Sequence, residues 1–90
     1  EPIVNTALSN IKNTGVDKSL SGPVQRGDFR TIQKHIAALK KLDSREKILI
    51  LRSYVLQSLI LLEIIKRERK RLTLGQNRLK KILEGELKRL

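Results

Sequence analysis

Residues 48–65 read ILILRSYVLQSLILLEII, and 13 of these 18 residues are apolar. No Gly or Pro interrupts the stretch, and its helical pattern continues to about Arg71. Wound at about 100° per residue, the polar side chains collect on one side and leave an apolar arc wider than half the circumference. A single neighbouring helix cannot cover such an arc. The sequence therefore predicts a central helix surrounded by other helices, a helix that pairs with a partner subunit, or both.

Five polar side chains interrupt the same stretch, which a membrane-spanning helix tolerates poorly. The chain starts at Glu1 rather than Met, and no basic segment followed by an apolar stretch marks a signal peptide. We expect a piece of a longer protein that lies in the cytoplasm and has no membrane partner.

Three further helices are expected around the central one. Their ranges are residues 2–13, residues 29 to about 41, and a last helix that follows Thr73. Asp28 and Thr73 have the short oxygen-bearing side chains that cap helix N-termini, and Asp43 or Ser44 is expected to cap the central helix. Gly75 and Gly85 should weaken the last helix by about 1 kcal/mol each relative to Ala. The prediction is an all-α bundle of four helices in one domain, residues 1–90.

The formal net charge is +11, from 20 Lys and Arg against 9 Asp and Glu. The excess is densest in residues 66–90, which hold ten cations and three anions. Glu63 and Glu68 are interleaved with these cations, and the sequence shows no motif that recognises nucleic-acid bases. A solvated helix surface is therefore favoured over a nucleic-acid site. The sequence has no Cys, a single His, one Phe and one Tyr. This composition argues against a metal centre and against an aromatic platform for single-stranded nucleic acid.

Residues 20–28 read LSGPVQRGD and form the most distinctive segment of the chain. We expect an irregular connection over residues 16–27, in which Pro23 keeps Gly22 out of helical geometry. Arg26 beside a helix N-terminus suits a carboxylate or a phosphate, and Gly22 and Gly27 let the backbone approach a ligand closely. An ordinary interhelical turn closed by an Asp28 cap explains the same residues. The Arg-Gly-Asp tripeptide also spells a cell-attachment sequence, but a three-residue match carries little weight.

This segment and the helix after it resemble the C-terminal domain, itself of unknown function, of Rossmann-like predicted oxidoreductases. That domain is related in architecture to the dimerising C-terminal domains of 6-phosphogluconate dehydrogenase-like enzymes. In the family, an Asn-containing helix leads through a Gly into Leu-Thr-Gly-Pro-x-x-Arg-Gly-Asp and then into a His-Leu-x-x-Leu helix. The matching residues here are Asn10, Gly15, Ser21 in place of the Thr, Gly22, Pro23, Arg26, Gly27, Asp28 and His35. The match is specific over residues 2–42. The family's Tyr near position 51 is Leu51 here, and Tyr54 follows almost one turn later.

The resemblance implies hydride transfer in a cleft between this domain and a Rossmann-like half. NADP or NAD would be bound mainly by that half, because this chain has neither a strand pattern nor a Gly-x-Gly-x-x-Gly motif. The chain alone is therefore not expected to be catalytic. The implied ligand-binding residues, for a small-molecule substrate, are Ser21, Gly22, Pro23, Arg26, Gly27 and Asp28, and the implied catalytic residues are His35 and Asn10.

Other interpretations of these residues and of the chain stay open. By its position, His35 is also typical of a partly buried, hydrogen-bonded helix residue, and Asn10 of a last-turn residue near a cap. We expect a homodimer through residues 48–65. The alternatives to an oxidoreductase domain are a purely structural dimerisation module and a basic helical nucleic-acid-binding protein.

Overall fold

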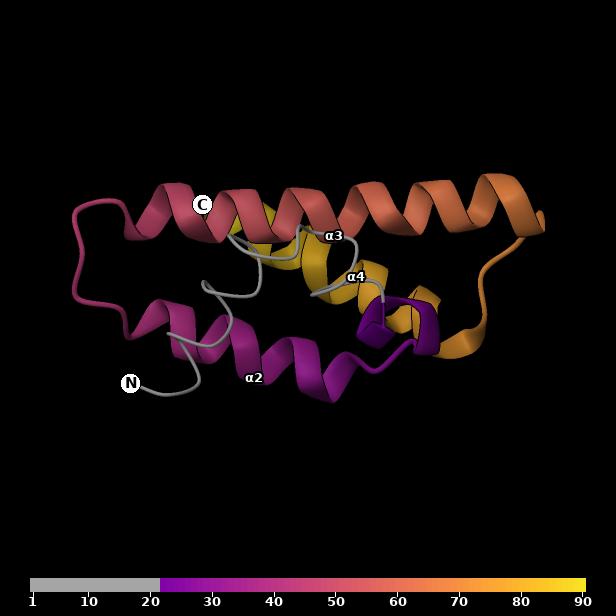
Figure 1. Ribbon diagram of the computed structural model, residues 1–90, viewed down its shortest axis with the longest axis horizontal. Helices are drawn as coiled ribbons and strands as arrows, with labels where there is room; N and C mark the ends of the chain where they lie inside the picture. The colour runs from indigo at the N-terminus through magenta and orange to yellow at the C-terminus, as the bar shows by residue number, and fades with distance from the viewer. Residues whose placement is uncertain (1–21) are drawn as a thin grey trace.

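The computed structural model describes residues 22–90, which contain three helices and no strand (Figure 1). The helices are α2 (Phe29–Lys40), α3 (Lys47–Arg69) and α4 (Leu74–Arg89), and residues 22–26 add one helical turn before α2. Each of the three helices packs against the other two. The predicted all-α class is confirmed over this range. The helix expected at residues 2–13 and the site residues Asn10 and Ser21 lie outside the described residues.

The turn over residues 22–26 replaces the irregular connection that the sequence predicted. Gly22 is helical, so the expectation that Pro23 excludes helical geometry there is wrong. The fixed φ of proline suits the first turn of a helix, where its missing N–H costs no hydrogen bond. The turn ends in a Schellman motif, in which Gly27 N–H donates to Val24 O at 3.0 Å and Asp28 N–H donates to Pro23 O at 2.8 Å.

Helix α2 begins at Phe29, directly after the predicted N-cap residue Asp28. The Asp28 carboxylate accepts a hydrogen bond from Thr31 N–H at 3.2 Å, which satisfies one free amide of the first turn. Ile32, Ile36 and Leu39 form the buried face, and the helix ends at Lys40, one residue before the expected end. The predicted Asp28 cap is therefore confirmed.

Helix α3 begins later than predicted, at Lys47. Ser44 Oγ accepts the backbone N–H of Glu46 at 3.1 Å, so the hydroxyl closes a turn ahead of the helix instead of capping it. Glu46 occupies the N-cap position without a side-chain hydrogen bond. The expectation that Asp43 or Ser44 caps this helix is wrong, because Glu46 is the N-cap and the Ser44 hydroxyl bonds to Glu46. At the other end, Lys70 has a left-handed φ of 73°.

Helix α3 buries only a stripe of its apolar surface in the described fold. The buried residues recur every three or four positions and are Leu51, Tyr54, Val55, Ser58, Leu62 and Ile65. Ile48, Leu49, Leu56 and Ile60 remain 44–65 % exposed. Helix α3 packs against both α2 and α4, but within residues 22–90 these two helices do not surround it. By length and composition alone α3 could also cross a membrane, and a third of its most apolar 18-residue window is buried in the fold.

Helix α4 starts with a capping box formed by Thr73 and Gln76. Gln76 N–H donates to Thr73 Oγ1 at 3.1 Å, and Thr73 N–H donates to Gln76 Oε1 at 2.9 Å. Leu79 and Leu83 are fully buried against the other helices. The predicted Thr73 cap is confirmed. Gln76 also donates from Nε2 to Gln25 O at 2.7 Å and so ties the start of α4 to the 22–26 turn.

Candidate functional site

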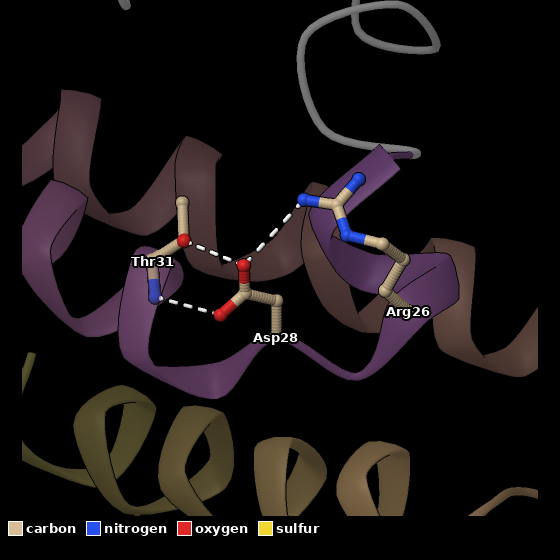
Figure 2. A network of polar contacts seen from close by, with 3 residues as sticks. All are labelled: Arg26, Asp28 and Thr31. Carbon is tan, nitrogen blue, oxygen red and sulfur yellow. Dashed lines mark hydrogen bonds and ion pairs between the residues drawn. The ribbon is translucent and has the colours of Figure 1, made fainter.

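Three polar side chains meet where the 22–26 turn runs into α2 (Figure 2). Asp28 Oδ2 accepts a hydrogen bond from the Thr31 hydroxyl at 2.7 Å and forms an ion pair with Arg26 Nη2 at 3.5 Å. The other carboxylate oxygen, Oδ1, accepts the Thr31 amide. The hydroxyl and amide of Thr31 hold the pKa of Asp28 below its usual value, and Arg26 lowers it further. Asp28 is therefore a carboxylate whose two oxygens already have partners.

Arg26 is the accessible member of this group. Its side chain is 64 % exposed, and the ion pair with Asp28 is its one ion pair among the described residues. An exposed pair of this length contributes little to stability. The guanidinium is therefore free to bind a carboxylate or phosphate, while the helix amides beside it are partly occupied by the Asp28 cap.

One turn further along α2, His35 contacts α3. His35 Nδ1 lies 2.7 Å from Tyr54 Oη, and the two rings meet edge to face at an interplanar angle of 77°. Tyr54 is 2 % exposed, and its burial raises the pKa of the phenol. Partial burial lowers the pKa of His35, while the Asp28 carboxylate acts in the opposite direction. Both shifts favour the neutral form of the side chain.

These charge states determine which His35 nitrogen can serve a ligand. A phenol O–H is a stronger donor than a neutral imidazole N–H, so we assign the Tyr54 proton to the bond with Nδ1. The imidazole then carries its own proton on Nε2. His35 can offer that N–H to a carbonyl or alkoxide oxygen, and Tyr54 fixes the ring that carries it.

Comparison with known protein families identifies one family that matches this chain. The model of the family described as Domain of unknown function (DUF2520) matches residues 1–58. The chain belongs to this family. No curated protein and no solved structure matches the chain.

The DUF2520 match contains every site residue that the sequence predicted, and it also contains Tyr54. Within it, Asp28, Thr31 and His35 lie at i, i+3 and i+7 and so share one side of α2. Arg26 reaches this side of α2 through its ion pair with Asp28, and His35 lies in the middle of the helix, one turn beyond Thr31. Tyr54 was not predicted as a site residue, because the family's Tyr lies near position 51, where this chain has Leu51. Tyr54 follows Leu51 by three residues and so lies on the same side of a helix, which was the sequence signal that could have found it.

The glycines and the proline of the Gly-Pro-x-x-Arg-Gly-Asp segment shape the backbone of this site. Gly27 is buried with a φ of 64°, and a Cβ built on it would lie 2.7 Å from Gln76 N. The missing side chain of Gly27 is thus explained by close packing on α4, which lies outside the family match. Contact of Gly22, Pro23 and Gly27 with a ligand stays a prediction. Among the described residues, no group of three His, Asp or Glu side chains could hold a metal ion.

Proposed function

We propose that this DUF2520 domain is the substrate-binding and dimerisation domain of a cytoplasmic NAD(P)-dependent oxidoreductase. Its helices would form a bundle like the C-terminal domains of 6-phosphogluconate dehydrogenase-like enzymes, and NAD or NADP would bind mainly to a Rossmann-like domain beyond this chain. The observation that carries the proposal is that Asp28, at the start of α2, pairs with the exposed Arg26, while His35, seven residues after Asp28, is hydrogen-bonded to Tyr54. The Gly-Pro-x-x-Arg-Gly-Asp motif supports the relation to that family.

The chemistry of these residues favours a small anionic substrate with a reacting oxygen. Arg26 would bind a carboxylate or phosphate in two parallel hydrogen bonds. His35 would donate its Nε2 proton to the oxygen of a carbonyl that accepts the hydride, or hold the hydroxyl of the reduced form. Asn10 and Ser21 would complete the catalytic and binding groups, and Gly22, Pro23, Gly27 and Asp28 would fix the backbone beside the substrate.

Dimerisation would use the face of α3 that the described helices leave open. Leu49, Leu56 and Ile60 follow one another at spacings of seven and four residues, which places them along one side of the helix. Burial of apolar surface of this kind drives subunit association. A second copy of α3 is the proposed occupant.

The experiment uses the full-length protein that contains this domain. Titration with NADH and NADPH should show binding of one of them, and the bound cofactor should be oxidised by a member of a panel of 2-oxo acids and phosphorylated carbonyl compounds. His35→Gln should leave cofactor binding unchanged and slow the oxidation by about 10²-fold or more. A full-length protein that binds neither cofactor would leave the structural dimerisation module as the better account, since the Schellman motif and the Gly27 packing already explain the turn.

A further inference from the structure

The C-terminal end of α3 carries a dense group of exposed cations. Residues 66–71 read KRERKR and are all exposed. We call Lys66, Arg67, Arg69, Lys70 and Arg71 the basic tip. Within residues 22–90 none of these five side chains forms an ion pair, whereas Lys40 and Arg89 pair with Glu86. Figure 1 shows the connection from α3 to α4 at one end of the molecule, on the right of the view.

An exposed leucine accompanies the basic tip. Arg69, Arg71, Leu72, Thr73 and Leu74 line one open hollow. Leu74 is 89 % exposed and is the most exposed of the large apolar side chains described. Cations near the end of a helix stabilise its dipole, which accounts for Arg67 and Arg69. That effect accounts neither for Arg71, which lies beyond the helix, nor for an apolar side chain in solvent between cations.

The chemistry of this tip fits a lipid surface better than a nucleic acid. Single-stranded nucleic acid is held by stacking on exposed aromatic rings. Of the two aromatic residues, Tyr54 is buried, and Phe29 is covered by the Arg78 guanidinium at 4.4 Å from the ring centroid. Leu74 adds nothing to phosphate binding, but it can enter the acyl region of a bilayer while neighbouring cations contact the headgroups.

We propose that the basic tip and Leu74 bind the surface of an anionic membrane. The chain would lie on the surface with Leu74 inserted below the headgroups and with Arg69 and Arg71 on lipid phosphates. This surface shares no residue with the proposed oxidoreductase site, although Gly75, next to Leu74, packs on Gly27.

The test measures flotation of the chain with vesicles of phosphatidylcholine alone and with vesicles that contain about one third phosphatidylserine. We expect binding to the anionic vesicles only, and weaker binding as salt is added. Arg69→Gln with Arg71→Gln should weaken binding about 25-fold, at about fivefold per cation. The matched control is Lys34→Gln with Lys41→Gln, which removes the same charge from exposed positions of α2 and its end and should change binding less than twofold.

Variants of Leu74 distinguish insertion of this side chain into the bilayer from purely electrostatic binding to its surface. Leu74→Ser should weaken binding about tenfold at every salt concentration, whereas Leu74→Met should bind like the parent chain. Circular dichroism confirms that each variant is folded. Equal losses in the two charge variants would assign the binding to net charge and overturn the proposal. An unaffected Leu74→Ser variant, or tighter binding to duplex DNA or single-stranded RNA at the same salt, would also overturn it.

Discussion

The backbones of Gly27 and Gly75 touch where the 22–26 turn meets the first turn of α4. A Cβ on Gly75 would lie 2.9 Å from Gly27 O, and a Cβ on Gly27 would lie 2.8 Å from the Gly75 carbonyl carbon. Two segments 48 residues apart are thus held closer than any side chain at either position would allow. This contact fixes the turn that carries Arg26 to the rest of the fold.

Alanine at the two glycines of α4 should therefore act in opposite directions. Gly75→Ala gains helix propensity but forces two backbones apart, so we expect a net loss of about 1–3 kcal/mol of unfolding free energy. Gly85 has nothing within 4 Å of a Cβ, so Gly85→Ala should gain about 1 kcal/mol. Chemical denaturation of both variants measures the difference. Stabilisation by both substitutions would show that the Gly27–Gly75 contact does not constrain the fold.

The Asp28 carboxylate should make stability depend on pH in acid. Its pKa in the folded chain is below its usual value of 3.8, so the unfolded chain takes up its proton first as the pH falls. The stabilisation is complete above pH 3.8 and is lost as the pH falls through the lower, folded pKa. Asp28→Asn keeps an oxygen for the cap but cannot titrate. The Tm of the parent chain should therefore exceed that of Asp28→Asn at pH 6, and the gap should close toward pH 2. A gap that is constant with pH would contradict the assigned network.

Tyr54→Phe should change His35 without disturbing the core. The variant keeps the buried ring and removes the O–H that we assign as donor to His35 Nδ1. We expect a loss of about 1 kcal/mol of unfolding free energy and a rise in the pKa of His35, because the neutral imidazole loses a hydrogen bond that favours it. Nitrogen-15 NMR of the imidazole measures both the tautomer and the pKa. The assignment fails if the His35 nitrogen shifts are the same in the two proteins.

The lowered pKa of His35, which contacts Tyr54, predicts a second change of stability with pH. The pKa of His35 is below its usual value of 6.5 in the folded chain, so its contribution is complete above pH 6.5 and is lost as the pH falls through the folded pKa. His35→Gln removes this titration. The difference in Tm between the parent chain and His35→Gln should shift between pH 7 and pH 5, and a difference that stays constant over that range would contradict the burial of His35.

Charged residues on the open face of α3 should separate the subunits. Leu56→Glu with Ile60→Glu places two carboxylates on side chains that are 44 % and 57 % exposed, so the fold should survive. Leu59 is a poorer choice, because it packs against the core. Sedimentation should show a dimer for the parent chain and a monomer for the variant. Leu74→Glu, at an exposed leucine that starts α4 and lies outside residues 48–65, serves as the control. A parent chain that is monomeric at high micromolar concentration would contradict the proposed interface.

Local signals predicted much of this fold. Asp28 and Thr73 cap helices as expected, because a cap depends on a short side chain and on amides within three residues of it. Residues spaced by three or four positions lie on one side of a helix, and the buried residues of α2 and α4 have this spacing. Ser44 shows the limit of this reasoning, since its hydroxyl could reach more than one nearby amide and closes a turn instead.

Features that depend on contacts between distant residues were not predictable. From the sequence alone, Gly75 is expected only to weaken a helix. Its role becomes clear from the close approach of the Gly27 backbone, which leaves no room for a Cβ at position 75. Tyr54 and His35 are 19 residues apart, and their hydrogen bond requires the packing of α2 on α3. Gln76 joins the start of α4 to Gln25 across 51 residues, and no local pattern marks it.

Ligand binding by Arg26 tests the proposed function most directly. In the full-length protein with its cofactor bound, binding of the panel compound that is turned over should weaken about 10- to 100-fold in Arg26→Lys, because lysine cannot supply a planar pair of donors. Arg45→Lys, at an exposed position before α3, is the matched control and should bind like the parent. The Tm of Arg26→Lys should be nearly unchanged, since Arg26 is exposed and its ion pair is weak. Unaltered binding in Arg26→Lys, or a large fall in its Tm, would contradict the account and assign Arg26 to the scaffold.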